Sequence, residues 1–270
     1  MTLSIQILST DFDGTLHSDF ENPPVPSALE RQIEDLQSRG VTWVINTGRD
    51  LSSLMEALGR ARLSVWPDYV VSVEREIYRR TGSHYVGLKD WNEQCRIAHD
   101  EVFLLLRQDL PQIMDWVQSR FDARVYEDTY SPFCLTAQSN ADADLIHDYL
   151  NEYCDRVPKL TVVRNDVYAR FSHSAYNKGT ALAEIGRLLG INREHIVAAG
   201  DHLNDLPMLS IDYARWLIAP SNAVEAVKEA VRRQQGYVSH QPNGHGLADG
   251  LERVLESCGS TAVHVNSWVV

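Results

Sequence analysis

Two aspartates separated by one residue follow a short apolar stretch near the start of the chain. The apolar residues Ile5, Ile7 and Leu8 predict a buried strand that leads directly into Asp11 and Asp13. This spacing allows both carboxylates to face one cleft on an extended or sharply turning backbone. The same five-residue string, Asp-Phe-Asp-Gly-Thr, also fits an ordinary acidic turn, so the pair predicts a site only together with other groups.

A second acidic cluster follows another predicted strand, the apolar run at residues 196–199. Asp201 stands at the tip of that strand, and Asn204 and Asp205 follow three and four residues later, so they return to the same side if a helical turn begins there. Together with Asp11 and Asp13, these aspartates concentrate negative charge that a hard cation would offset. Mg²⁺, with oxygen ligands and retained waters, fits this set best. Taken alone, the cluster also fits a helix start rich in Asp and Asn.

Two further groups could bind an anion. Thr47 and Gly48 end the apolar run at residues 41–45 and open a predicted helix, where a hydroxyl and free backbone N–H groups form an anion site. Lys178 stands just before another predicted helix, and its ammonium could pair with a phosphoryl oxygen. Taken alone, Thr47 also fits an ordinary helix N-cap. Lys178 alone also fits a solvated charge on the surface.

Strands and helices alternate in the outer parts of the chain. Such alternation predicts βαβ units and an α/β fold with a parallel sheet. Ligands bind beyond the carboxyl ends of the strands in such sheets, and all the polar clusters above lie there or beside it. The first helix is expected to begin with a capping box formed by Ser27 and Glu30 and to end at Gly40.

The middle of the chain follows a different order of helix, two strands, helix and two strands. We therefore expect a catalytic core made of residues 1–82 and 174–270, with an inserted α+β domain at residues 83–173. An insertion tethered at both ends near the site could close over a ligand. The last two strands of this insertion form a predicted hairpin, although exposed polar hairpin residues are usually only solvated. The hairpin residues that could contact a substrate are Arg164, Tyr168, Arg170 and His173.

The bulk composition narrows the class of protein. The chain has 270 residues, 44% of them hydrophobic, and a formal net charge of −12, which is poorly suited to non-specific binding of nucleic acid. No apolar run reaches the ~20 residues of a membrane span, and the N-terminus lacks the pattern of a signal peptide. We expect a cytoplasmic protein that contacts neither nucleic acid nor a membrane. The four cysteines are scattered and predict neither zinc nor a disulfide framework.

These clusters, in their order, resemble the four motifs of haloacid dehalogenase (HAD) superfamily phosphatases. The inserted block is similar to the α+β cap of the Cof-type branch, which includes sugar-phosphate phosphatases. Two stretches depart from the pattern: Asn46 replaces a small residue, and residues 72–77 replace an Asn-Gly pair and resemble the sucrose-phosphate phosphatase branch. The motifs are Asp11-Phe12-Asp13-Gly14-Thr15, Thr47-Gly48-Arg49, Lys178 and Gly200-Asp201-His202-Leu203-Asn204-Asp205.

The resemblance implies a Rossmann-like parallel-sheet core with an inserted cap, and a Mg²⁺-dependent phosphatase acting on a small phosphorylated metabolite. Asp11 would be the nucleophile that forms an aspartyl-phosphate, and Asp13 the general acid and base. The metal would be held by Asp11, the Asp13 backbone carbonyl and Asp201, with Asp205 nearby. The phosphoryl oxygens would be bound by Thr47, Gly48, Lys178 and Asn204.

Two alternatives to hydrolysis of a sugar phosphate remain open at this point. The same pair of aspartates could return the phosphoryl group to a sugar, as in a phosphomutase. The fold could also serve a catalytically silent protein that binds sugar phosphates. Hydrolysis of an aryl phosphate with Mg²⁺ would separate the phosphatase from the silent protein, and dependence on a bisphosphate activator would indicate the mutase.

Overall fold

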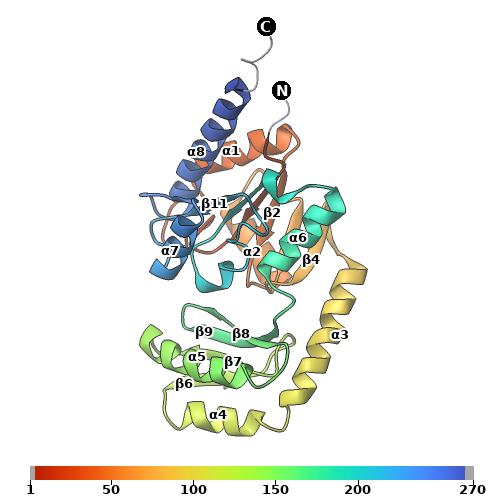
Figure 1. The fold of residues 1–270 in the computed structure, drawn as a ribbon, viewed down its shortest axis with the longest axis vertical. Helices are drawn as coiled ribbons and strands as arrows, with labels where there is room; N and C mark the ends of the chain where they lie inside the picture. Colours follow the sequence, from red (N-terminus) through yellow and green to blue (C-terminus); the bar gives the residue numbers. More distant parts are fainter. Residues whose placement is uncertain (1–3, 265–270) are drawn as a thin grey trace. The chain divides into compact units, whose positions relative to one another are not determined.

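The structure is a computed structural model that describes residues 4–264 (Figure 1). The chain forms two compact units. The first combines Met1–Gly87 with Lys178–Val270, and the second is Leu88–Asn177. Within the described residues, no helix combines the length and the apolar character that a membrane span requires.

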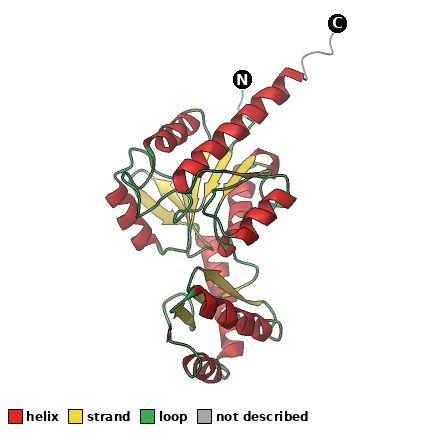
Figure 2. Cartoon of the chain, turned by 90° about the vertical axis from the view of Figure 1, so that its left-hand side faces the viewer, coloured by secondary structure: helices red, strands yellow, loops and turns green. Residues whose placement is uncertain are grey.

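An eight-stranded sheet forms the centre of the first unit, with strand order β12-β11-β10-β1-β2-β3-β4-β5. Neighbours from β12 to β3 pair in parallel, and β3, β4 and β5 pair antiparallel. Helices lie on both sides of the sheet (Figure 2). The predicted α/β fold is thereby confirmed. The strands are β1 (Ile7–Thr10), β2 (Thr42–Asn46), β3 (Tyr69–Ser72), β4 (Glu76–Thr81), β5 (His84–Gly87), β10 (Ile196–Ala199), β11 (Trp216–Ala219) and β12 (Tyr237–Val238).

The helices of the first unit bury apolar stripes against the sheet. Leu29, Ile33 and Leu36 of the first helix belong to one apolar core with Leu247 and Leu251 of the last. Burial of such side chains is the main source of stability in a fold of this kind. The helices are α1 (Ser27–Ser38), α2 (Leu51–Ala61), α6 (Lys178–Leu189), α7 (Glu225–Arg233) and α8 (Asn243–His264), with short 3₁₀ turns η1 (Arg193–His195) and η2 (Leu203–Asp205).

The start of α1 differs from the expected capping box. Ser27 is the first residue inside the helix, and Pro26 at the N-cap position makes no side-chain cap. The carboxylate of Glu30 instead accepts hydrogen bonds from the backbone N–H (2.6 Å) and the hydroxyl (2.7 Å) of Ser64. A partner that is distant in sequence has therefore replaced the local interaction.

The second unit has α+β architecture around its own core. A four-stranded antiparallel sheet of order β6-β7-β9-β8 includes the buried side chains of Leu135 and Phe171. They belong to one cluster with Phe133, just before β7, and with Ile146 and Leu150 of a helix. Residues 84–87, expected in the inserted block, pair with β4 in the first unit instead. The elements are α3 (Lys89–Leu106), α4 (Leu110–Gln118), β6 (Ala123–Tyr126), β7 (Cys134–Ala137), α5 (Asn140–Cys154), β8 (Leu160–Asn165) and β9 (Tyr168–His173).

Candidate active site

Adjacent parallel strands bring the predicted site residues to one edge of the sheet. Asp11 follows β1, Thr47 follows β2, and Asp201 lies two residues beyond β10. Because β1 pairs in parallel with both β2 and β10, the three carboxyl ends lie side by side. The backbone N–H of Asp11 donates to the carbonyl of Ala199 (2.8 Å), which extends the pairing to the site itself.

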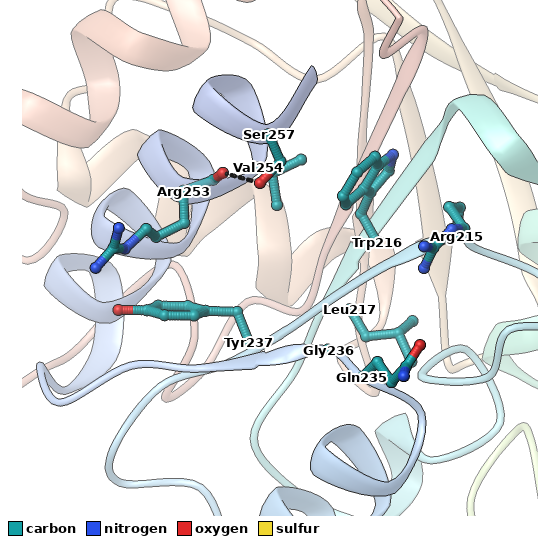
Figure 3. Close-up of a pocket in the computed structure, with 9 residues that line it drawn as sticks. All are labelled: Arg215, Trp216, Leu217, Gln235, Gly236, Tyr237, Arg253, Val254 and Ser257. Atoms are coloured by element: carbon teal, nitrogen blue, oxygen red, sulfur yellow. Dashed lines mark hydrogen bonds between the residues drawn. The ribbon is translucent and has the colours of Figure 1, made fainter. Parts of the chain in front are cut away.

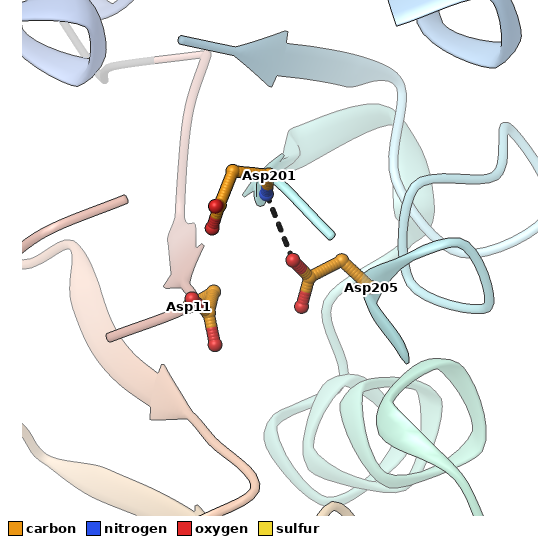
Figure 4. A group of neighbouring side chains, drawn as sticks. All are labelled: Asp11, Asp201 and Asp205. Carbon is orange, nitrogen blue, oxygen red and sulfur yellow. Dashed lines mark hydrogen bonds between the residues drawn. The ribbon is translucent and has the colours of Figure 1, made fainter. Parts of the chain in front are cut away.

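Three carboxylates meet at this edge. Asp11, Asp201 and Asp205 each offer one oxygen, and these oxygens all lie within 4.8 Å of one another (Figure 4). The second oxygen of Asp205, Oδ2, accepts hydrogen bonds from the backbone N–H groups of Asp201 (2.8 Å) and His202 (2.9 Å). Asp205 therefore fixes the turn that presents Asp201.

Lys178 lies inside this cluster and not on the surface. Its side chain is 0% exposed, and its Nζ donates to Oδ1 of Asp11 (2.7 Å) and Oδ1 of Asp205 (2.5 Å). Asn46, one of the departures from the family pattern, donates from Nδ2 to the backbone carbonyl of Lys178 (2.9 Å). The amide of Asn46 thus anchors the start of α6 to the end of β2.

Burial and crowding perturb the charges of the cluster. Burial, with the neighbouring Asp205, raises the pKa of Asp11 well above its ordinary value and raises the pKa of Asp201 to about 7. Burial alone would lower the pKa of Lys178, but Asp11 and Asp205 raise it above its ordinary value. A single ammonium among three close carboxylates leaves an excess of negative charge. Clustered carboxylate oxygens with such an excess fit a hard divalent cation such as Mg²⁺.

The turn after β1 is shaped to hold Asp201. Gly14 has a φ of +80°, and a Cβ at this position would lie 2.5 Å from Oδ2 of Asp201, so a larger residue would clash. Thr15 donates from its hydroxyl to Oδ1 of Asp201 (2.7 Å). Asn222 donates to the carbonyl of Gly14 (2.9 Å) and reaches Oδ2 of Asp201 at 3.4 Å.

The carboxylate of Asp13 faces a different partner. Arg49 donates to it from Nε (2.6 Å to Oδ2) and Nη2 (2.7 Å to Oδ1). Among the described residues, the carboxylates close enough to share an ion do not include that of Asp13. Any metal contact of Asp13 would therefore come from its backbone carbonyl, as the resemblance of the motifs implied.

Thr47, Gly48 and Asn204 form the end of the site that was expected to bind phosphate. The hydroxyl of Thr47 accepts a weak hydrogen bond from the Arg49 N–H (3.2 Å), while the cap of α2 is provided by Asp50. A Cβ on Gly48 would lie 3.8 Å from Nδ2 of Asn204. The structure thus brings together Thr47, Gly48 and Asn204 and does not use Thr47 as the helix cap.

Several residues at the site had no role assigned from the sequence. Arg49 and Thr15 lie within two of the four motifs, and this position was the only indication in the sequence that they belong to the site. Glu74, which accepts a hydrogen bond from Asn204 Nδ2 (2.9 Å), lies in the stretch 72–77 that departs from the family pattern, and that departure was its only signal in the sequence. Asn222 lies outside the four motifs, so their spacing did not indicate it.

The four hairpin residues of the second unit have partners within that unit. Arg164 forms an ion pair with Asp144 of α5. Tyr168 donates from its hydroxyl to Sγ of Cys134 (3.7 Å), and the guanidinium of Arg170 lies 5.9 Å from the Tyr168 ring centre. Nδ1 of His173 accepts from the Ala175 N–H (3.1 Å). These side chains are therefore part of the packing of the unit, and not simply solvated.

A hollow of about 320 Å³ lies at the amino ends of β11 and β12 (Figure 3). Arg215, Trp216 and Tyr237 are among its lining residues, with Arg253 and Val254 of α8. None of the predicted site residues lines it. The carboxyl ends of the strands, where the aspartates cluster, therefore remain the candidate active site.

Comparison with known proteins assigns the family. Residues 5–254 match the model of the Sucrose-6F-phosphate phosphohydrolase family. A phosphoglycolate phosphatase from Methanopyrus kandleri is 40% identical over 253 residues, covering 93% of this chain and 97% of that protein. The 5-amino-6-(5-phospho-D-ribitylamino)uracil phosphatase YcsE of Bacillus subtilis is 25% identical over 242 residues, covering 84% and 88%.

Solved structures agree on the fold. The sucrose-phosphatase from Synechocystis sp. PCC6803, in complex with sucrose and phosphate, superposes with a TM-score of 0.67 at 17% identity, covering 94% of this chain and 98% of that one. The fold and site thus define a HAD superfamily phosphatase. The chain belongs to the Sucrose-6F-phosphate phosphohydrolase family of these enzymes.

Proposed function

We propose that this phosphatase hydrolyses a small phosphorylated metabolite, a sugar phosphate, through an aspartyl-phosphate on Asp11 and with Mg²⁺ as cofactor. The observation that carries this proposal is the position of Lys178. Its buried Nζ contacts both Asp11 and Asp205, and so holds a positive charge beside the carboxylate that would attack phosphorus. A lysine placed in this way stabilises the charge of a transferring phosphoryl group.

The chain's own residues can divide the reaction into two steps. An oxygen of Asp11 attacks phosphorus, the bond to the leaving oxygen breaks, and Asp13 gives that oxygen a proton. Asp13 then takes a proton from water, and the water oxygen attacks the phosphorus of the aspartyl-phosphate. The Asp11 carboxylate and orthophosphate are the products, and Asp13 is protonated again. Thr47, Gly48, Lys178 and Asn204 would bind the phosphoryl oxygens.

The metal would be held by the Asp11 carboxylate, the Asp13 backbone carbonyl and Asp201. When bound there, Mg²⁺ would screen the repulsion between the attacking carboxylate and the phosphate. Both oxygens of Asp205 already accept hydrogen bonds, from Lys178 and from two backbone N–H groups. We therefore assign Asp205 to supporting the other ligands of the metal.

The leaving group is proposed to be a sugar or a similar polyol. Support comes from the family model, which is named for sucrose phosphate, and from the similar fold of a sucrose-phosphatase. The relative YcsE is named for a phosphorylated ribityl compound, which is also a polyol. Phosphoglycolate is a second candidate substrate, because a relative that is 40% identical is named for it.

The test is orthophosphate release from a panel of sugar phosphates, polyol phosphates, phosphoglycolate and an aryl phosphate, with Mg²⁺ present. Asp11→Asn should abolish turnover and phosphoenzyme formation, because an amide is a poor nucleophile. The phosphoenzyme can be followed as a hydroxylamine-sensitive adduct on the Asp11 peptide by mass spectrometry. Near wild-type turnover of Asp11→Asn, with deamidation excluded, would refute the nucleophile. Transfer of phosphate between positions of a sugar, without orthophosphate release, would indicate a mutase.

A further inference from the structure

The loop between β3 and β4 has an unusual backbone. Val73 and Glu74 have φ values of 45° and 69°, in the left-handed region that glycine normally occupies. A β-branched residue such as valine is especially unfavourable there. Strain of this kind persists where the surrounding structure imposes it, and it is concentrated at functional sites.

Two hydrogen bonds tie this loop to the phosphate end of the candidate site. The N–H of Val73 donates to the carbonyl of Arg49 (2.9 Å), and the N–H of Glu74 donates to the carbonyl of Thr47 (2.9 Å). The strained pair is therefore fixed to both sides of Gly48. This arrangement directs the side chain of Glu74 toward the same residues that would bind the phosphoryl group.

The carboxylate of Glu74 lies among those residues. It is 6% exposed, and its Oε1 accepts from Nδ2 of Asn204 (2.9 Å). A Cβ on Gly48 would lie only 3.2 Å from the same oxygen. Glu74 also contributes to the raised pKa of Lys178, so its charge acts on that ammonium.

The contact with Asn204 determines how that amide is turned. A carboxylate oxygen only accepts hydrogen bonds, so it must face the NH₂ group of Asn204 and not its carbonyl oxygen. The Oδ1 of Asn204 is buried and has no hydrogen-bond partner within the described part of the chain. The NH₂ group of Asn204 is therefore held by Glu74, and its Oδ1 faces away from Glu74.

A fixed negative charge beside an anion site weakens the binding of anions. Two like charges a few ångströms apart repel strongly in a partly buried site. In a phosphatase this repulsion acts on the product, because orthophosphate must leave before the next turnover.

We propose that Glu74 is a positioning residue that orients Asn204 and whose charge limits the affinity of the site for orthophosphate. This inference rests on the proposed phosphatase mechanism, because it takes Gly48, Lys178 and Asn204 as the phosphoryl-binding groups. It assigns the Glu74 loop to product release.

The test separates the charge of Glu74 from its hydrogen bond. Glu74→Gln keeps an oxygen that can accept from Asn204 but removes the charge. We expect orthophosphate to bind roughly 10-fold more tightly to this variant, both as a competitive inhibitor and by calorimetry on the Mg²⁺-loaded protein. Glu74→Gly also suits the positive φ, but it removes the hydrogen bond to Asn204 together with the charge. We therefore expect orthophosphate to bind less tightly to Glu74→Gly than to Glu74→Gln.

Glu76→Gln is the matched control, because Glu76 is the first residue of β4, directly after this loop, and its carboxylate accepts from the Tyr78 hydroxyl (2.7 Å). Its orthophosphate affinity should equal that of wild type. Equal affinity in wild type and Glu74→Gln would overturn the effect of the charge, and equal affinity in Glu74→Gln and Glu74→Gly would overturn the positioning of Asn204. Either result would leave the mechanism intact. A wild-type protein that neither binds orthophosphate nor hydrolyses any phosphomonoester would instead overturn the proposed function, and the inference with it.

Discussion

Arg49 holds Asp13 through both oxygens of its carboxylate. Its Nε lies 2.6 Å from Oδ2 and its Nη2 lies 2.7 Å from Oδ1. The guanidinium also lies 5.3 Å from the ring centre of Phe12. A planar fork that binds a carboxylate at two points fixes its orientation, which a point charge cannot do.

Replacement of Arg49 should therefore impair the proton transfer assigned to Asp13. We expect Arg49→Lys to lower kcat/KM by ~10-fold, because lysine keeps the charge but not the two-point contact. The loss should be largest for poor leaving groups, which need a proton most. Steady-state kinetics with a series of aryl phosphates of different leaving-group acidity would measure it.

A double-mutant cycle gives the control for this pair. In an Asp13→Asn background, Arg49→Lys should have little further effect, because residues that act as a unit are not additive. Fully additive losses would show that Arg49 acts independently of Asp13.

The carboxylate cluster predicts dependence on a divalent metal. Activity should disappear in chelator and return with Mg²⁺, and Asp201→Ala should lower the rate severely and weaken the metal dependence. Calorimetric titration of Mg²⁺ gives a readout that does not depend on turnover. Asp212→Ala, at an exposed carboxylate, is the matched control. Full activity after exhaustive dialysis against chelator would refute the metal site.

Removal of the Lys178 ammonium should reduce both activity and stability. We expect Lys178→Ala to lower kcat/KM by ~10²–10³-fold, the usual cost of losing one transition-state stabiliser. In chelator, the free energy of unfolding should fall by roughly 3–5 kcal/mol, because Asp11 and Asp205 lose a buried counter-ion. Stopped assays and urea denaturation measure the two effects. Lys228→Ala, at a surface helix, should change neither, and an unchanged kcat/KM in Lys178→Ala would exclude Lys178 from catalysis.

The hairpin of the second unit is predicted to select the leaving group. Substitution of Arg164, Tyr168, Arg170 or His173 should change the ranking of sugar phosphates while largely sparing an aryl phosphate. Because Arg164 is paired with Asp144, its variant also needs a thermal-unfolding measurement. The exposed Arg124 provides a control substitution in the same sheet. If the ranking of substrates is unchanged in all four variants, or if kcat/KM falls by the same factor for every substrate, the hairpin does not select the leaving group.

His173 should make stability depend on pH. Burial lowers its pKa, and the charge of Lys159 adds to this effect while Glu101 opposes it. The neutral imidazole is therefore favoured in the folded state, and its stabilising contribution is present above the unfolded pKa of about 6.5 and is lost as pH falls through the folded value. Urea unfolding between about pH 7.5 and 5 should show decreasing stability, with a shallower slope in His173→Gln. An identical slope in that variant would assign the effect to other groups, such as His147, whose pKa is lowered in the same direction.

Continuous apolar runs made the parallel strands predictable. The run at residues 41–45, for example, contains most of β2, because a strand covered on both faces needs apolar residues at every position. The strand β4 was missed because Arg79 and Arg80 are exposed in it, so its sequence gives no such run. Its place is determined by pairing with β3, which no local pattern encodes.

The rule that ligands bind beyond the carboxyl ends of parallel strands predicted which site residues would be neighbours. It did not predict which side chains would form hydrogen bonds or ion pairs with each other. The structure brings Asp11, Lys178 and Asp205 together, while their catalytic roles stay predictions. The contact of Glu74 with Asn204 could not be predicted, because it depends on the left-handed backbone of the loop and on a separation of 130 residues.

The pairing of β1 with β10 has a consequence for how the protein is made. Ile7 is in register with Ile196, so the sheet of the first unit pairs two segments of the chain that the whole second unit separates in sequence. The second unit, Leu88–Asn177, is continuous and can fold while the ribosome is still adding β10 and the later strands. The nascent β1, β2 and β3 must wait for β10 with an unpaired apolar edge, which is a hazard for aggregation. The entropic cost of closing a loop grows only slowly with its length, so the inserted residues add little to the free energy of pairing β1 with β10. The main effect of the insertion is the longer time during synthesis before β10 is available to pair.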